Sequence, residues 1–194
     1  EQSRGCPLSA RSGLSRPAQL LSHYPFGAGG QSCLAADCRL FPETDNEMST
    51  SNRKTASFGV PWESAYGYVQ AVRVNNSIFV SGQLSHTPEG QLVAPAALGA
   101  DGKPANFDTM EAQMKRTYEN AQVLLAELGG SLADVVEETL FVIDVPAAFA
   151  ASSKVRPAVY GQPVPQVASN LIGVSALAFP EQLIEIAFRA EVQP

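Results

Sequence analysis

Residues 107–130 form the part of the sequence that most limits the possible folds. They read FDTMEAQMKRTYENAQVLLAELGG, with apolar and small side chains at helical spacing. The stripe consists of Met110, Met114, Thr117, Ala121, Leu124, Leu125 and Leu128. It predicts an amphipathic helix that packs one face on a core. Asp108 and Glu111 have the spacing of a capping box, so Asp108 is the expected N-cap, and the glycine pair predicts the end.

Short strands are expected on both sides of this helix. The runs YGYVQAVRV and SIFVSGQL, joined by two asparagines, predict a hairpin before it. After it, VVEETLFVIDV predicts a strand and PAAFAASSKVRPAVYG a second helix, which Pro157 should kink or end. The segment 164–174 and QLIEIAFRAEV predict two further strands. This order favours a two-layer α+β sandwich, in which two helices cover one face of a mixed sheet.

A long stretch without charge lies near the end of the chain. No charged side chain occurs between Arg156 and Glu181, and within this stretch VPQVASNLIGV predicts a buried strand. The expected strands carry more apolar side chains than two helices can cover. These are Val72, Phe79, Leu140, Val142, Ile172, Val174 and Ile186. A homo-oligomer that buries the second face of the sheet is therefore expected.

Composition divides the chain near residue 47. Residues 1–47 are rich in Ser, Gly, Pro and Arg and lack hydrophobic periodicity, which predicts a disordered extension. Three interpretations remain open: an extension foreign to the natural protein, a targeting peptide rich in Arg and Ser, or a functional tail. Residues 48–63 are expected to lead into a folded domain at residues 64–192.

The cysteines all lie in the first forty residues. Cys33 and Cys38 are five apart, Cys6 is distant, and His23 is the nearest histidine, so the spacing does not favour a zinc site. A domain without cysteine fits a reducing compartment, and the cytoplasm is the expected location. Neither a metal nor a cofactor is expected, because GxGxxG, P-loop, HExxH and GxSxG motifs are absent.

The charge balance is acidic. The chain has 13 Lys and Arg against 19 Asp and Glu, a net charge of −6 at pH 7. Four of the basic and five of the acidic residues precede residue 48, so the domain itself remains acidic. Nucleic-acid binding requires a basic surface, and a membrane helix requires about 18 consecutive apolar residues. Neither partner is therefore expected.

Three segments together resemble the Rid family, also called YjgF or L-PSP endoribonuclease-like. They are YGYVQAVRVNNSIFVSGQL, LLAELGGSLADVVEETLFVIDV and VASNLIGVSALAFPEQLIEIAFRAEV, which span most of residues 64–192. The resemblance implies a chorismate-mutase-like fold and a homotrimer with small-molecule clefts between subunits. For the founding subgroup it also implies hydrolysis of enamine or imine intermediates, such as 2-aminoacrylate, to a keto acid and ammonia.

The resemblance also implies candidate site residues. Tyr68 and Glu185 match the catalytic tyrosine and glutamate, and Ser81 and Gly82 match the ligand-binding Ser-Gly pair. A structural alternative is open for each of them. Tyr68 is otherwise a half-buried strand tyrosine, Gly82 a packing glycine, and Glu185 one half of an ion pair, for example with Arg189.

One expected residue is missing. In the deaminating subgroup, the strand after the second helix carries an arginine that binds the substrate carboxylate. The alignment puts Ser169 there, with Asn170 and Leu171 at the next two ligand positions, and Ser153 near an asparagine of the second helix. Loss of a bidentate guanidinium–carboxylate contact weakens binding strongly. This change predicts altered or lost activity of the family's usual kind.

Two explanations of the missing charge remain open. The pocket formed by Tyr68, Ser81, Ser169 and Asn170 would suit an uncharged or aromatic ligand. Alternatively, another cation replaces the arginine. Arg156 and Arg189 are the late candidates, whereas Arg73 should point to the sheet face opposite Tyr68.

Three functions follow from these observations. The first is a deaminase or hydrolase acting on enamines or imines. The second is a non-catalytic trimer that binds a small metabolite or acts like a chaperone. The third, which the acidic charge disfavours, is an endoribonuclease or translation inhibitor. His86 is expected either as an ordinary loop histidine or as a ligand contact.

Overall fold

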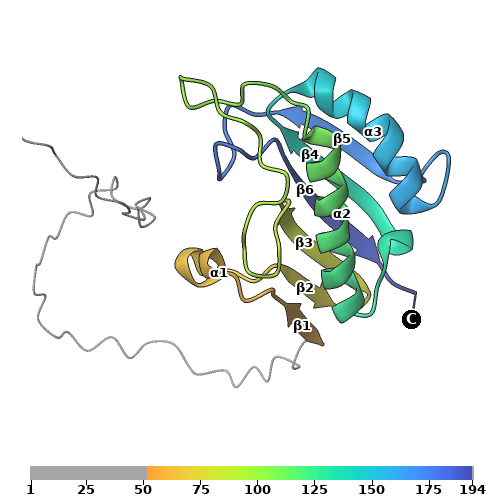
Figure 1. Ribbon diagram of the computed structural model, residues 1–194. Helices are drawn as coiled ribbons and strands as arrows, with labels where there is room; N and C mark the ends of the chain where they lie inside the picture. The colour runs from red at the N-terminus through yellow and green to blue at the C-terminus, as the bar shows by residue number, and fades with distance from the viewer. Residues whose placement is uncertain (1–51, 194) are drawn as a thin grey trace, which may run out of the picture. The chain divides into compact units, whose positions relative to one another are not determined.

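The computed structural model describes residues 52–193. The predictions for residues 1–47, including those for the cysteines, lie outside this range. Within it, six strands form one mixed sheet in the order β1-β2-β3-β6-β4-β5, and two long helices cover one face (Figure 1). The strands are β1 (Arg53–Ala56), β2 (Ala71–Val74), β3 (Ser77–Gln83), β4 (Val135–Val142), β5 (Ala168–Gly173) and β6 (Ile184–Glu191). The predicted two-layer α+β sandwich is confirmed.

The helices are α1 (Pro61–Tyr66), α2 (Met110–Glu127), the short 3-10 helix η1 (Leu132–Asp134) and α3 (Val145–Tyr160). Every member of the predicted stripe on 107–130 is buried. The predicted cap is wrong, because Thr109 takes the N-cap position and makes no side-chain bond to the helix. Asp108 lies one residue outside, where its N–H donates to Asn106 Oδ1 at 3.2 Å. No helix among residues 52–193 is long and apolar enough to cross a membrane.

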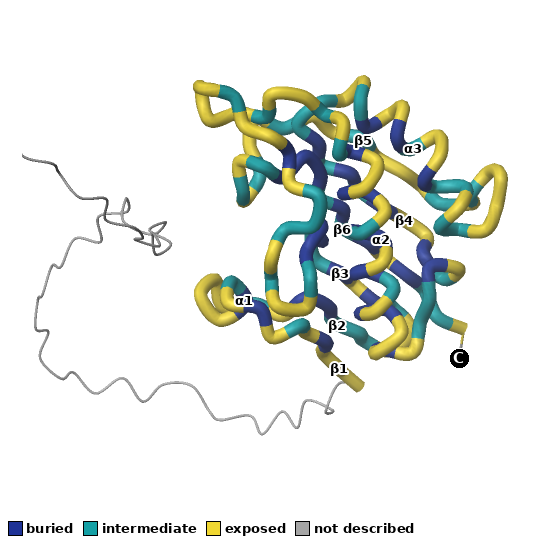
Figure 2. The backbone as a smooth tube through the Cα atoms, in the orientation of Figure 1, coloured by how far each residue is buried: buried dark blue, intermediate teal, exposed yellow. Residues whose placement is uncertain are grey.

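The sheet is antiparallel except for one pair. β4 and β5 run parallel, so their connection must cross over the sheet, and α3 makes that crossover. Along β6, Ile184, Ile186 and Phe188 are buried beneath the helices, whereas Glu185 and Arg189 face the opposite side. Figure 2 shows the buried positions concentrated where β3, β6 and α2 pack at the centre of the molecule.

The start of the domain differs from the prediction. The strand predicted at residues 66–74 begins only at Ala71, because Gly67 ends α1 in the left-handed region (φ +78°). Tyr68 therefore lies in the turn between α1 and β2, not in a strand. The short strand β1 was not predicted; it pairs with β2 inside the expected lead-in. The predicted turn at Asn75 is confirmed by its left-handed backbone (φ +54°).

Two predictions about the last third are also wrong. Pro157 does not end α3, since the helix continues to Tyr160 and closes at Gly161. A proline one turn before the end removes only one hydrogen bond. The neutral segment forms β5, but this strand is largely exposed rather than buried, because it is the last strand of the sheet. Ile172 on β5 and Phe79 on β3 are about half exposed.

Candidate functional site

A cavity of about 350 Å³ lies at the sheet face opposite the long helices. Four of the predicted site residues, Tyr68, Ser81, Gly82 and Glu185, line it together. The remaining walls come from α1, from the residue after β3 and from the loop before β6. They are Trp62, Tyr66, Leu84, Ala178 and Phe179. The cavity therefore has largely aromatic walls and contains one carboxyl group, that of Glu185.

Glu185 occupies space that only a glycine leaves open. An ideal Cβ on Gly82 would lie 1.9 Å from Glu185 Oε1. Gly82 sits where the register of β3 and β6 shifts, which brings the β3 backbone close to the carboxyl group. Gln182 Nε2 donates to Glu185 Oε2 at 3.3 Å. Burial raises the pKa of Glu185, and the bond from Gln182 only partly opposes this.

Glu185 and Arg189 do not form an ion pair within the single chain, and the interface ion pair suggested for Glu185 stays a prediction. The guanidinium of Arg189 pairs with Glu191 at 3.2 Å on the same strand. Glu185 has no salt-bridge partner within residues 52–193. The carboxyl group of Glu185 is therefore available to contact a bound ligand.

A buried glutamine orients the two hydroxyl groups of the cavity. Gln70 Oε1 accepts hydrogen bonds from Gln83 Nε2 (2.8 Å) and Ser81 Oγ (3.2 Å). Gln70 Nε2 in turn donates to the Tyr68 hydroxyl at 3.2 Å. Because the Tyr68 oxygen accepts this bond, its own proton remains free for a ligand or a water. Burial raises the pKa of Tyr68, so the phenol stays protonated at neutral pH.

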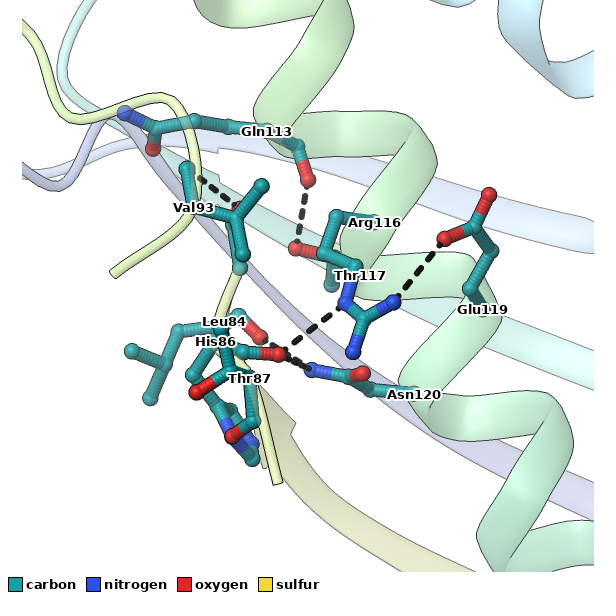
Figure 3. A network of polar contacts seen from close by, with 10 residues as sticks. Leu84, His86, Thr87, Val93, Gln113, Arg116, Thr117, Glu119 and Asn120 are labelled. Carbon is teal, nitrogen blue, oxygen red and sulfur yellow. Dashed lines mark hydrogen bonds and ion pairs between the residues drawn. The ribbon is translucent and has the colours of Figure 1, made fainter. Parts of the chain in front are cut away.

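Side chains of α2 donate hydrogen bonds to the chain after β3 (Figure 3). Asn120 Nδ2 donates to the carbonyls of Leu84 (2.9 Å) and His86 (3.1 Å), and Arg116 Nε donates to the latter at 3.0 Å. The buried ring of His86 packs edge-on against Trp62 with 5.3 Å between centroids. Burial lowers the pKa of His86. His86 does not line the cavity; it supports Trp62, which does.

The other predicted ligand residues lie elsewhere. Ser169 on β5 sits opposite Glu138 on β4, and its Oγ donates to Glu138 Oε1 at 2.8 Å on the helix side of the sheet. Asn170, the next residue, faces the other side and reaches only Thr139 Oγ1 at 3.5 Å. The single chain therefore does not bring Ser169 and Asn170 to the cavity. The neutral pocket was expected between subunits, so it stays a prediction.

Leu171 and Ser153 have structural contacts in the single chain. Leu171 packs against the core. Ser153 is exposed on α3, and its Oγ donates to the carbonyl of Ala150 one turn earlier at 2.7 Å. Neither residue lines the cavity.

Glu138 forms a second polar centre that the sequence did not reveal. It is fully buried on β4 and accepts four hydrogen bonds. The donors are Tyr118 Oη (2.7 Å), Tyr160 Oη (2.6 Å), Arg156 Nε (2.5 Å) and Ser169 Oγ (2.8 Å). Burial and the neighbouring carboxylate raise the pKa of both tyrosines. A buried carboxylate is tolerated only with such compensation.

Comparison with known proteins decides the family. A family model described as Endoribonuclease L-PSP matches residues 60–192. The chain belongs to this family. A RutC family protein of Pyrococcus abyssi is 36% identical over 98 residues, which are 50% of this chain and 67% of that protein. The mitochondrial protein Mmf1 of Saccharomyces cerevisiae is 30% identical over 82 residues, 42% of this chain and 48% of the yeast protein.

Solved structures of the L-PSP family share this fold. A Mycobacterium tuberculosis member of the YjgF/YER057c/UK114 family superposes with a TM-score of 0.58 at 26% identity, covering 72% of this chain and 99% of its own. RidA from an Antarctic Psychrobacter gives a TM-score of 0.52 at 29% identity, covering 64% and 88%. The predicted membership of the Rid/YjgF family and its chorismate-mutase-like fold are confirmed.

Several residues at or beside this cavity were not predicted from the sequence. Trp62, the only tryptophan in the chain, lies in the segment treated as a lead-in. Gln70 follows Tyr68 by two residues, a spacing that could have pointed to a shared hydrogen-bond network. Phe179 and Gln182 precede β6, and no periodic pattern of apolar residues marked them in the sequence.

The arrangement allows proton transfer beside a hydrophobic wall. Burial raises the pKa of Glu185 and so favours its protonated form relative to an exposed glutamate, and Tyr68 can donate a hydrogen bond. Among residues 52–193, no group of three or more His, Cys, Asp or Glu side chains is placed to hold a metal ion. The side chains of Glu185 and Tyr68 offer acid–base chemistry to a bound organic molecule.

Proposed function

We propose that this protein hydrolyses enamine or imine intermediates to keto compounds and ammonia, with Glu185 as the acid–base group. The observation that carries this proposal is the half-buried carboxyl group of Glu185, which faces the cavity without a cationic partner among residues 52–193. Partial burial of an unpaired carboxyl group costs free energy, so a role at the cavity explains its retention.

The proposed reaction uses groups that already face the cavity. Ionised Glu185 removes a proton from a water molecule, which adds to the carbon of the C=N bond. Glu185 passes that proton to the nitrogen, which gives a carbinolamine. Glu185 then transfers the hydroxyl proton of the carbinolamine to the nitrogen, so that the C=O bond forms, the C–N bond breaks and ammonia leaves. An enamine first needs a proton on carbon, which protonated Glu185 can supply. Tyr68 orients the water or the nitrogen through its free proton.

We propose further that the active form is a homotrimer with the cavity at an interface between copies. Ile172 and Phe79 are about half exposed on the sheet face that the long helices leave uncovered. The outer edge of β5 pairs with no strand in the described range, and such edges are usually covered. Size-exclusion chromatography with light scattering tests this, and a monomer at micromolar concentration would contradict it.

The experiment for the activity compares matched glutamate variants. Imines are generated in situ by an amino-acid oxidase, and formation of the keto product is timed with and without the protein. Glu185→Gln should lose about 100-fold or more of the acceleration, the usual contribution of a general acid–base group. Glu127→Gln, an exposed carboxylate of α2, should leave the rate unchanged. Equal rates for Glu185→Gln and wild type would refute the proposal.

A non-catalytic binding or chaperone-like function is the second candidate. It is favoured by Ser169, whose hydroxyl is bound to Glu138 instead of supplying the charge expected at that position. In that case wild type binds keto acids without hydrolysing imines, and Ser169→Arg gains hydrolysis. RNA cleavage is not proposed, because the only charged lining residue in the cavity is acidic.

A further inference from the structure

The two oxygens of the Glu185 carboxyl group have different surroundings. Oε2 accepts a hydrogen bond from Gln182 Nε2 at 3.3 Å, whereas Oε1 accepts none from residues 52–193. Oε1 lies against Gly82, since an ideal Cβ on that residue would be 1.9 Å from it. Gly82 and Glu185 both line the cavity. One oxygen is therefore held by the protein, and the other is available to a ligand.

The amide of Gln182 can serve Glu185 only as a donor. Its nitrogen also donates to the carbonyl of Ile184 at 3.1 Å, and a carbonyl oxygen only accepts. If the amide were turned over, its oxygen would face two acceptors. When Glu185 is protonated, the proton therefore sits on Oε1, because a proton on Oε2 would meet an N–H group.

The main chain around Gln182 is fixed from α2. Gln113 is fully buried on that helix. Its Oε1 accepts the N–H of Leu183 at 2.9 Å, and its Nε2 donates to the carbonyl of Glu181 at 2.9 Å. The N–H of Gln182 itself donates to the carbonyl of Phe179 at 3.1 Å. These bonds hold the residues on both sides of Gln182, so the core and not a ligand sets the place of its side chain.

The surroundings of the Gln182 side chain indicate more than a packing role. The residue is 0% exposed, and its amide oxygen has no hydrogen-bond partner among residues 52–193. An apolar side chain of similar length would fill the same space without an unpaired buried carbonyl. Within the described range, Glu185 is the only side chain to which this amide is hydrogen-bonded. Contact with Glu185 therefore explains why an amide stands at this position.

We propose that Gln182 is a positioning residue that binds Oε2 of Glu185 and leaves Oε1 as the single oxygen that accepts and returns protons. This rests on the proposed function, because it assigns each oxygen a part in that reaction. Oε1 takes the proton from water and returns it to the nitrogen, while Oε2 stays bound to Gln182. The bond favours the ionised carboxylate, which is the form that acts on water.

Few titratable groups can complicate a measurement on Glu185. Those on the elements around it are Tyr66, Tyr68, Glu63, Glu137 and Arg189. The carboxylate of Glu63 accepts two main-chain N–H groups of its own. Glu137 and Arg189 lie opposite each other four residues along β6, about 13 Å from Glu185. Glu185 is the only carboxyl group in the described range that lines the cavity, so a carboxyl titration there reports on it.

The test makes two measurements on the full chain. The first is the pH dependence of imine hydrolysis. The second is the titration of the Glu185 carboxyl carbon by NMR with isotope-labelled glutamate, assigned through Glu185→Gln. Gln182→Met removes the donor and keeps the length of the side chain. Without the donor the pKa of Glu185 should rise, so the acid side of the rate profile and the carboxyl titration should both move to higher pH.

Two more variants separate positioning from a purely structural role. Gln182→Glu is nearly isosteric but replaces the donor with a second carboxyl group, so both curves should move further than in Gln182→Met. Gln122→Met removes a glutamine whose Oε1 accepts the N–H of Leu132 at 3.1 Å, and neither residue lines the cavity. It should lower the melting temperature slightly and leave both curves in place. At the plateau of its profile, Gln182→Met should be about tenfold slower than wild type, because its carboxyl group can rotate away.

Several results would overturn the inference. They are unchanged curves in Gln182→Met, equal shifts in Gln182→Met and Gln122→Met, or loss of the fold in Gln182→Met, which would show that the amide serves the core. The proposed function fails separately: a shifted carboxyl titration without imine hydrolysis by wild type refutes the activity alone. Hydrolysis that depends on Glu185 but keeps its pH profile in both Gln182 variants refutes this inference alone.

Discussion

Gly82→Ala tests whether the close approach of β3 holds Glu185 in place. The new Cβ would lie 1.9 Å from Oε1, 2.6 Å from Cδ and 2.8 Å from Cγ of Glu185. An ordinary contact needs about 3.4 Å or more, so the carboxyl oxygen must retreat by about 1.5 Å. A displacement of about 1 Å can lower an enzymatic rate by about a hundredfold. We therefore expect Gly82→Ala to lose about 100-fold of the imine-hydrolysis rate.

The fold should tolerate this change. Gly82 lies outside the left-handed region, and the atoms that must move belong to one flexible side chain. Overpacking costs about 1 to 3 kcal/mol. Reduced freedom of the unfolded chain offsets about 0.4 to 1 kcal/mol of this. The urea midpoint should fall only slightly, and Gly99→Ala, which meets Asp101 instead, should keep the rate. Full activity of Gly82→Ala would refute the reasoning about Glu185.

Three further predictions concern the same two polar centres. Because the pKa of Glu185 is higher in the folded than in the unfolded chain, protonated Glu185 stabilises the fold. This stabilisation is complete at pH values below the pKa of an unfolded glutamate, and it is lost as the pH rises through the pKa of the folded state. The melting temperature should thus fall less over that window in Glu185→Gln than in wild type, and parallel curves would contradict this. Tyr118→Phe removes one donor from buried Glu138 and should cost about 1 to 3 kcal/mol in urea unfolding, whereas exposed Tyr66→Phe should cost nothing measurable. Tyr68→Phe should slow imine hydrolysis about tenfold or more with unchanged stability, and an unaltered rate would remove Tyr68 from the mechanism.

Elements set by local sequence were predictable. The stripe on α2 depends on spacing within one segment, and all its members are buried. The N-cap of α2 was predicted wrongly because Asp108 and Thr109 are both favourable N-cap residues. The path of the preceding loop decides between them, and the local sequence does not encode that path. The strand predicted from residue 66 is too long because Tyr68 and Val69 continue its pattern of alternating apolar side chains. The left-handed conformation of Gly67 ends α1 there, so the strand begins only at Ala71.

The site was predictable in part. Tyr68, Ser81, Gly82 and Glu185 meet because β3 and β6 are neighbours in the sheet and the turn before β2 brings Tyr68 beside them. Strand alternation already implied that Ser169 and Asn170 face opposite sides. The link from Arg156 to Glu138 joins residues 18 positions apart across a crossover, and no local pattern encodes such a pairing.

The centre around Glu138 also constrains how this sequence can vary. Removing one donor from a buried carboxylate is costly, whereas joint replacement of the whole group by apolar residues of similar volume can be nearly neutral. Tyr118, Glu138, Arg156, Tyr160 and Ser169 should therefore show strong epistasis. In a deep mutational scan, single substitutions at these positions should be depleted, and tolerated changes should come as combinations. These five positions, carried by α2, β4, α3 and β5, should then evolve as one coupled unit.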